Sequence, residues 1–287
     1  MKYKVDITSD PHWDFWIPYQ DPEYVQVKKF NLLFDIILPE VPSKILCIAG
    51  DLGHFNDQNL MAFRILKERG YESIVYCFGN HDRYLVSKAQ ARKYDLDSGN
   101  RLKEMVKLTS QIEGVYHING TLVDIGGLKI GGAEMWYDFQ YGIINHESTV
   151  QSLYELWRAR SNDSRMIFIN TINGMVDCLA LFKEQYALME KVYKDCDIVM
   201  SHVGPDWSQI HPRYKEASTS FFYFDGGRLL ASMSPKQVWL HGHTHDCFSF
   251  THKSGVQIHC NPLGYPLAGD WQFEPFSQRI KTIEIEK

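Results

Sequence analysis

Buried-strand patterns recur along this chain, and they constrain its fold more than any other feature. Apolar runs of strand length occupy five segments, at 5–8, 45–49, 74–78, 198–200 and 238–240. Each run ends in a Gly-rich or polar turn, and several are followed by helical periodicity. Strands that are apolar throughout are buried on both faces, which is typical of sheets covered by helices. The pattern therefore predicts an α/β fold.

Two stretches between these strands are predicted to be mainly helical, at about 83–110 and 140–195. In the second, six apolar residues repeat at spacings of four and three, as on one core-facing side of an amphipathic helix: Met175, Leu179, Phe182, Tyr186, Met189 and Tyr193. No repeat or Pro/Ser-rich linker marks a domain boundary. A chain of 287 residues that is 44% hydrophobic can bury one large core. We expect a single domain over 1–287 with both stretches as insertions.

Composition and charge exclude several classes of protein. The formal net charge is −5, so the chain has no overall attraction for nucleic acid or anionic membranes. Six cysteines occur without a C-x-x-C pair, which is typical of a reduced compartment. The start of the sequence lacks a signal-peptide pattern, and no apolar run reaches the roughly 20 residues of a membrane span. We expect a soluble, cytoplasmic protein.

Metal-ligand residue types follow each of the five strands. The segments are Asp10-Pro11-His12, Gly50-Asp51-Leu52-Gly53-His54, Gly79-Asn80-His81-Asp82, Ser201-His202 and His241-Gly242-His243-Thr244-His245. Because the carboxyl ends of strands in an α/β sheet share one edge, these side chains are expected to converge there. Clustered imidazoles and carboxylates are costly to bury unless they are paired. A bound cation would resolve that cost, so the cluster predicts a metal site.

The spacing within the segments supports shared ligation. Asp10 and His12 are two residues apart, as are His243 and His245, so an extended strand end would direct each pair to one side. Gly50, Gly79 and Gly242 lie where the chain must turn tightly or approach a ligand. Five other histidines stand alone in the sequence and are interpreted as structural: His117, His146, His211, His252 and His259.

Taken in order, these segments resemble the calcineurin-like metallophosphoesterases, whose pattern is D-x-H, G-D, G-N-H-[DE], H and G-H-x-H. The resemblance covers about 10–264. It includes segments similar to a bacterial-type branch, Glu134-Met135-Trp136-Tyr137-Asp138-Phe139 and Asn261-Pro262-Leu263-Gly264-Tyr265. It implies a four-layer α/β/β/α sandwich with a two-metal site. One metal would be held by Asp10, His12 and His245, the other by Asn80, His202 and His243, with Asp51 bridging both.

The ligand set suits phosphate chemistry. Two divalent ions bring four positive charges and the two aspartates offset only two, which leaves the site attractive to phosphate. The mixed nitrogen and oxygen donors favour Mn, Fe, Zn or Ni over Ca or Mg, and Mn is our first expectation. The expected mechanism is in-line attack on phosphorus by a metal-bridging hydroxide, formed because the metals lower the pKa of water to about 7.

His81 belongs to neither metal in this scheme. We expect it to protonate the departing alkoxide, with Asp82 orienting its ring or raising its pKa. The alternative is a structural, hydrogen-bonded histidine. The position after Gly53 often carries Asp or another polar group in relatives, so His54 is equally consistent with supporting a ligand, facing the substrate or a structural role.

The remaining polar residues near the motifs have less defined roles. His241 is a candidate to support the ligands, whereas Asp6 and Asp14 are interpreted as structural. Several basic or aromatic residues are candidates for a substrate rim, although solvated helix faces are the favoured interpretation: Arg83, Arg101, Trp157, Arg158 and Arg160.

Three functions fit the sequence. The favoured one is a phosphomonoesterase or phosphodiesterase acting on a small soluble phosphate ester. The second is a nuclease of the same family, which the missing basic stripe and interleaved aromatic residues disfavour. The third is a non-catalytic protein-binding scaffold, which the complete set of ligand residues disfavours.

Overall fold

The chain forms two mixed β-sheets. The computed structural model describes residues 1–169, 176–266 and 279–287. The first sheet has the strand order β11-β1-β2-β3-β4, formed by Lys281–Glu286, Lys2–Thr8, Ile45–Ala49, Ser73–Cys77 and Val115–His117. The second has the order β5-β6-β7-β8-β10-β9, formed by Thr121–Ile125, Leu128–Gly132, Ile198–Met200, Val238–His241, Gln257–Cys260 and Phe248–Thr251. The strands that precede the five motifs are β1, β2, β3, β7 and β8, and neighbours among them run parallel.

Alternation along β2 shows how the two sheets share the core. Cys47 faces the second sheet, where it packs in one cluster with Ile198 and Leu240. Leu46 and Ile48 face the opposite side, toward the helices of the first layer. All of β2 is therefore buried, which is why its sequence is apolar without interruption.

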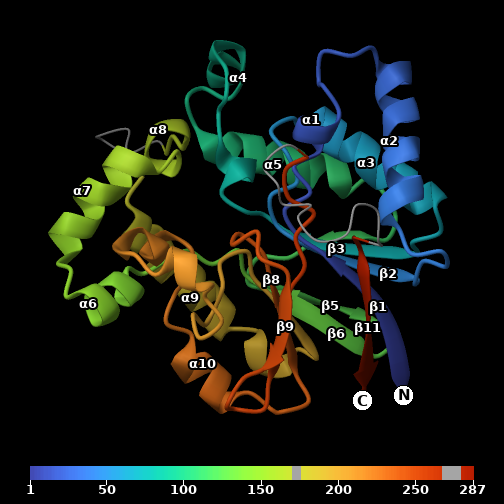
Figure 1. Ribbon diagram of the computed structural model, residues 1–287. Helices are drawn as coiled ribbons and strands as arrows, with labels where there is room; N and C mark the ends of the chain where they lie inside the picture. The colour runs from blue at the N-terminus through green and yellow to red at the C-terminus, as the bar shows by residue number, and fades with distance from the viewer. Residues whose placement is uncertain (170–175, 267–278) are drawn as a thin grey trace.

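Three long helices cover the outer face of the first sheet: α2, α3 and α5, spanning Glu23–Ile37, Asn56–Glu68 and Ser98–Thr109 (Figure 1). Shorter helices connect them: α1 at Trp13–Trp16, the 3-10 turn η1 at His81–Arg83 and α4 at Lys88–Lys93. Large apolar side chains such as Phe34 and Phe63 fill the space between helices and sheet.

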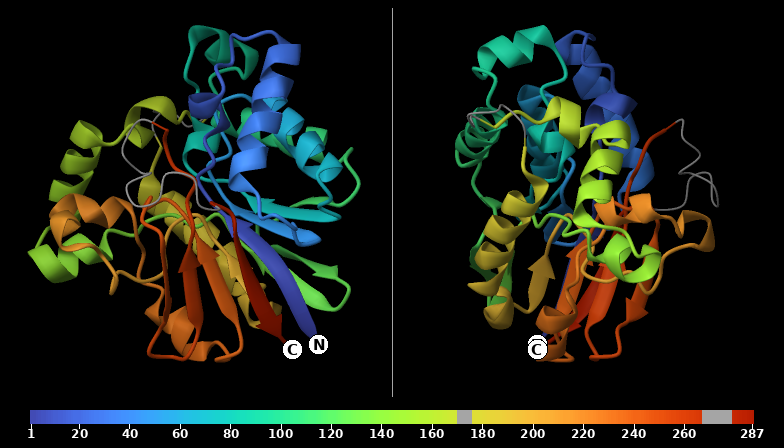
Figure 2. Two further views of the ribbon diagram at one scale, coloured as in Figure 1. Left: turned by 45° about the vertical axis from the view of Figure 1, so that its right-hand side comes forward. Right: turned by 90° about the vertical axis from the view of Figure 1, so that its left-hand side faces the viewer.

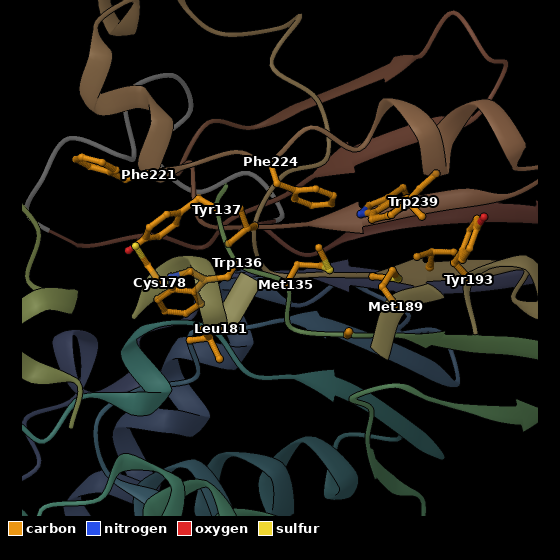
Figure 3. Close-up of a cluster of buried hydrophobic side chains, with 14 of the residues drawn as sticks. Met135, Trp136, Tyr137, Cys178, Leu181, Met189, Tyr193, Phe221, Phe224 and Trp239 are labelled. Atoms are coloured by element: carbon orange, nitrogen blue, oxygen red, sulfur yellow. The ribbon is translucent and has the colours of Figure 1, made fainter. Parts of the chain in front are cut away.

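The outer face of the second sheet is covered by α9 and α10, at Cys178–Glu190 and Gly227–Ser232. Figure 3 shows the cluster on this side, in which Trp136 and Tyr137 lie beside Cys178 of α9, with Phe224 and Trp239 farther along. The remaining helices precede α9 or connect later strands: α6 Gln140–His146, α7 Val150–Arg160, α8 Asp163–Met166, η2 Tyr193–Asp195, η3 Pro212–Tyr214 and η4 Ala217–Phe221.

The order of layers is thus helix, sheet, sheet, helix, which confirms the predicted α/β/β/α sandwich. The five predicted strands are also confirmed. In Figure 2, α6 to α8 stand to one side of the sheets. The two chain ends lie together because β11 pairs antiparallel with β1.

The amphipathic helix expected around residues 175–193 is present as α9, although its buried line differs. Cys178, Leu181, Gln185 and Met189 are fully buried, whereas Phe182 and Tyr186 are only partly buried. The prediction is correct at Met189 and Tyr193, whereas the first part of the buried line lies one position earlier than predicted, because it includes the buried polar Gln185. Met175 lies outside the described residues.

Candidate metal centre

Side chains from both sheets converge at the carboxyl ends of the strands. Three strands of the first sheet, β1, β2 and β3, lead into the segments with Asp10 and His12, with Asp51 and with Asn80. Two strands of the second sheet, β7 and β8, lead into the segments with His202 and with His243 and His245. Because the sheets are stacked, these ends form one site. The predicted convergence of the five motifs is therefore confirmed.

The first ligand group consists of Asp10, His12 and His245, whose candidate ligand atoms all lie within 4.8 Å of one another. The Nε2 atoms of His12 and His245 are 3.2 Å apart, and Asp10 Oδ1 is 3.5 Å from His245 Nε2. Asp10 and His12 are completely buried. Two imidazole nitrogens that face each other at this distance fit a shared cation.

The second group consists of Asp51, His202 and His243 and meets the same 4.8 Å limit. His202 Nε2 lies 3.3 Å from Asp51 Oδ2 and 3.1 Å from Asn80 Oδ1, so Asn80 adds an amide oxygen to this group. Asp51 Oδ2 is also 3.6 Å from His12 Nε2 of the first group. Asp51 is therefore the carboxylate that the two groups share.

Backbone carbonyls fix which ring nitrogen of two histidines faces the centre. His202 Nδ1 lies 2.9 Å from the carbonyl oxygen of Ala49, and His243 Nε2 lies 2.8 Å from that of Phe221. A carbonyl oxygen only accepts, so each of these nitrogens carries the proton. The lone pairs are left on His202 Nε2 and His243 Nδ1, as metal ligation requires.

Five of the candidate ligand residues have a left-handed backbone, including the four for which the spacing predicted an extended one. Their φ angles are positive: Asp10 (49°), His12 (43°), Asp51 (58°), His243 (69°) and His245 (53°). Such residues cost roughly 1–3 kcal/mol each and persist only where neighbouring contacts hold them. Here the backbone N–H of Asp10 donates to Gly50 and that of His12 to Asp51, both at 3.0 Å. Hydrogen bonds between loops, and not the alternation of a strand, therefore determine the direction of these side chains.

The glycines of the motifs leave room for the ligands. A Cβ on Gly79 would lie 2.2 Å from Asp51 Oδ1, and one on Gly242 would lie 2.5 Å from Asp10 Oδ2. Both contacts are too short for any side chain, so the carboxylates occupy space that only glycine leaves free. Of the two reasons predicted for these glycines, a tight turn or the close approach of a ligand, the close approach of a candidate ligand residue applies at Gly79 and Gly242.

The electrostatics of the site fit bound cations. Burial opposes the charged form of His202, but the Asp51 carboxylate outweighs it and raises the pKa of His202 to about 9. Burial, together with the charge of His81, holds the pKa of His12 well below its usual range. The carboxylates thus favour a positive charge next to His202, which a bound cation would supply in place of the ring proton. This set of carboxylate and imidazole donors suits divalent cations.

Asp82 has a different position from the one predicted. Its carboxylate accepts hydrogen bonds from the backbone N–H groups of Gly79 (2.8 Å), Asp51 (2.9 Å) and Leu52 (3.1 Å). It braces the loops that carry Asp51 and Asn80 and makes no described hydrogen bond to the His81 ring. Burial and the charge of Asp51 raise the pKa of Asp82 to about 7, although Arg101 opposes the shift.

His81 borders the centre, and its ring contacts His54 and not Asp82, the partner predicted from the sequence. Its ligand atoms lie within 4.8 Å of those of His12 and Asp51. His81 Nδ1 is 3.0 Å from His54 Nε2, while His81 Nε2 is 3.4 Å from the hydroxyl of Tyr265. Among the three roles considered for His54, this contact favours support of a site residue.

Asp163, at the start of α8, is a site neighbour that the sequence did not reveal. Its carboxylate accepts from Asn80 Nδ2 at 2.8 Å and from the hydroxyls of Tyr84 (2.5 Å) and Tyr137 (2.7 Å). Because the Asn80 amide nitrogen points to Asp163, its oxygen points to the centre. No sequence motif surrounds Asp163, so only the fold shows its position.

Arg83 and Arg101 are buried, not on solvated helix faces as favoured from the sequence. Arg83 pairs with Glu134 at 2.5 Å. Arg101 donates to the carbonyls of His81 (2.8 Å) and Tyr84 (3.1 Å), and so braces the η1 turn. Arg83 neutralises a buried carboxylate and Arg101 donates to buried carbonyls. The charge of an arginine in the sequence does not indicate such buried partners.

The other sequence candidates lie around the site or away from it. Trp157 is buried, whereas Arg158 and Arg160 are exposed. His241 is buried and its Nδ1 contacts the carbonyl of Gly242, with no described hydrogen bond to a ligand residue. Asp6 accepts from Ser43, Tyr71 and Thr282 inside the first layer, as expected of a structural residue.

A cavity of about 670 Å³ opens over the centre. Asp51, Asn80, His81, His243 and His245 form its floor. Its walls come from α7, α8, the segment around η3 and η4, and the region of Tyr265; they include Tyr84, Arg160, Tyr214, Phe221, Phe222 and Tyr223. The ligand groups are therefore accessible to a small molecule.

The fold and these ligand groups define a metallophosphoesterase. The sequence matches the calcineurin-like phosphoesterase family over residues 3–247, and the chain belongs to that family. Its family implies divalent metal ions as cofactors.

Individual relatives are distant. An uncharacterised protein, L509 of Acanthamoeba polyphaga mimivirus, is 24% identical over 230 residues, which cover 77% of this chain and 78% of the relative. The phosphopantetheinyl hydrolase PptH of Mycobacterium tuberculosis has a similar fold, with a TM-score of 0.68 and 14% identity over 98% of this chain and 95% of its own. A dimetal phosphatase of Danio rerio gives a TM-score of 0.45 at 13% identity, covering 99% and 93% of the two chains.

Proposed function

We propose that this protein hydrolyses a phosphomonoester or phosphodiester of a small soluble molecule, using two divalent cations, with Mn²⁺ as the favoured metal. The observation that carries the proposal is the convergence of two ligand groups that share Asp51. When bound, the cations would activate water and neutralise phosphate charge. Asp10, His12 and His245 would hold one, Asn80, His202 and His243 the other, and Asp51 both.

The protein's own residues complete the reaction. His81 and Tyr265 both line the cavity, and His81 Nε2 lies 3.4 Å from the Tyr265 hydroxyl, a position from which it would protonate the departing oxygen of the ester. The cavity walls would hold the remainder of the substrate next to these groups. Neither step requires a phosphorylated enzyme.

The walls favour a small ester over nucleic acid. Arg160 is the one Lys or Arg side chain among the described residues that line the cavity, and it lies 3.6 Å from Glu216. A nuclease that follows a strand would need a row of cationic contacts and a strong salt dependence. A binding scaffold would have no use for a complete, buried ligand set.

Metal analysis combined with a substrate panel tests the proposal. The metal-free protein would be reloaded with Mn²⁺, Fe²⁺, Zn²⁺ or Ni²⁺ and assayed on p-nitrophenyl phosphate, bis(p-nitrophenyl) phosphate and single-stranded DNA. We expect turnover of one of the small esters, greatest with Mn²⁺. Protein that stays inert with every metal would overturn the proposal, and preferential, salt-sensitive DNA cleavage would replace it by a nuclease.

Two variants separate metal binding from proton transfer. Asp51→Asn should lose metal and activity together, whereas His81→Ala should keep its metal and lose activity mainly on esters with poor leaving groups. Asp124→Asn, at an exposed position near the end of β5, is the matched control and should change neither property. Full metal content in Asp51→Asn would contradict the assignment of Asp51.

A further inference from the structure

A chain of three side chains runs from the metal centre into the protein. His81 Nδ1 lies 3.0 Å from His54 Nε2, and His54 Nδ1 lies 2.7 Å from Asp14 Oδ2. His54 is 6% exposed, and its ring stacks on Tyr84 at an interplanar angle of 12°. Both ring nitrogens of His54 therefore have a partner, Asp14 at Nδ1 and His81 at Nε2.

Asp14 holds His54 at two points. Its second carboxylate oxygen, Oδ1, accepts the backbone N–H of His54 at 3.0 Å. A Cβ on Gly53 would lie 2.8 Å from that oxygen, so the glycine leaves room for the carboxylate. The loop after Asp51 is thus shaped to hold one imidazole against one carboxylate.

The order of donors fixes the protonation of all three groups. An ionised Asp14 only accepts, so His54 Nδ1 carries the proton and His54 Nε2 is an acceptor. The proton between the two rings then belongs to His81 Nδ1. His81 Nε2 is left facing the cavity as the nitrogen that exchanges a proton.

We propose that Asp14 and His54 are positioning residues that fix the ring and tautomer of His81, so that its Nε2 serves as the acid for the leaving group. The proposal rests on the proposed function. In the step itself, the Nε2 proton moves to the departing ester oxygen, and His81 becomes neutral with its remaining proton on Nδ1. A buried carboxylate orients the imidazole in serine protease triads by the same principle.

Leaving-group dependence separates this role from a merely structural one. p-Nitrophenyl phosphate departs without a proton, whereas phenyl phosphate needs one. For the Mn²⁺-loaded protein, His54→Phe and Asp14→Ala should slow phenyl phosphate at least ~10-fold more than p-nitrophenyl phosphate in kcat. The metal content should stay unchanged. His54→Gln keeps an oxygen that can accept from His81 Nδ1, and it should restore most of the difference.

The matched control is Gln90→Ala. Gln90 Nε2 donates to the carbonyl oxygen of His54 at 2.6 Å, so its loss disturbs the same loop without touching the ring chain. It should alter both substrates by the same factor. Equal slowing of both substrates by His54→Phe and Asp14→Ala would overturn the proposal.

Imidazole ¹⁵N spectra of the zinc-loaded protein give a second readout that does not depend on turnover. Neutral His81 should carry its proton on Nδ1 in the wild type and lose this preference in His54→Phe. An Nε2–H tautomer in the wild type would overturn the proposal.

The two proposals fail in different ways. A wild-type protein inert on p-nitrophenyl phosphate and on bis(p-nitrophenyl) phosphate with every metal would overturn the proposed function, while the ¹⁵N spectra would still decide the tautomer. If His81→Ala showed the leaving-group effect and neither His54→Phe nor Asp14→Ala did, the positioning role alone would be wrong.

Discussion

Asn80 shows how a single residue depends on its surroundings. An amide presents an oxygen on one side and a nitrogen on the other, and only the oxygen can bind a cation. The Asp163 carboxylate accepts a hydrogen bond from the Asn80 amide nitrogen at 2.8 Å. Asp163 therefore determines that the oxygen of Asn80 is the atom that faces His202. Groups that orient a ligand in this way commonly affect metal affinity about 10- to 100-fold.

Asp163→Ala should therefore weaken binding of Mn²⁺ to the metal-free protein by ~10-fold or more, without unfolding it. Calorimetric titration would measure the affinity, and circular dichroism the fold. Asp177→Ala is the control, because Asp177 also accepts a tyrosine hydroxyl, that of Tyr154 at 2.6 Å, but caps α9 away from the centre. An unchanged affinity in Asp163→Ala would show that Asn80 is oriented by other contacts.

At the scale of elements, the loops after the strands are held by contacts that cross between them. The segment after β10 braces the end of β1, since the backbone N–H of Gly264 donates to Asp10 at 3.0 Å. Arg101 reaches from α5 to the η1 turn. Arg83 of η1 pairs with Glu134, whose carbonyl accepts the backbone N–H of His202 at 2.7 Å. These contacts link the loops that carry the candidate ligand residues.

The Arg83–Glu134 pair gives a stability prediction. Both side chains are nearly buried, so Arg83→Met would leave the Glu134 carboxylate without its partner. We expect the free energy of unfolding to fall by about 3–5 kcal/mol, and Arg83→Met combined with Glu134→Met to recover most of it. Urea unfolding of the metal-free proteins measures both changes.

The control for this prediction is Lys2→Met, which breaks an ion pair with Glu286 whose side chains are about 70% exposed. It should cost less than about 1 kcal/mol. An equal loss in Lys2→Met and Arg83→Met would mean that burial does not determine the effect.

At the scale of the whole molecule, the candidate metal centre joins the two sheets. The first sheet supplies Asp10, His12, Asp51 and Asn80, and the second supplies His202, His243 and His245. A cation that binds only the folded protein stabilises it by mass action. Among the described residues, no helix is both long and apolar enough to cross a membrane.

Metal removal should therefore lower the thermal midpoint. An ion at 100 times its Kd contributes about 2.7 kcal/mol, which corresponds to a decrease of about 5 °C on chelation. Scanning calorimetry with and without EDTA, followed by addition of Mn²⁺, measures the change. The thermal midpoint of Asp51→Asn should be the same with and without EDTA. A wild-type midpoint that EDTA does not change would contradict the assigned cation sites.

The sequence alone determined five buried strands and the convergence of the polar residues that follow them, while its resemblance to the metallophosphoesterases implied the layers and the seven candidate ligand residues. Apolar periodicity reports burial directly, and polar residues directly after buried strands must meet at one edge of an α/β fold. Only the tertiary structure decided the left-handed backbone of the ligands, the burial of Arg83 and the partners of His54 and Asn80. The reason is distance along the chain: 40 residues separate Asp14 from His54, and 83 separate Asn80 from Asp163. Contacts of that length leave no local pattern, because neither partner's neighbours in the sequence constrain where the other lies.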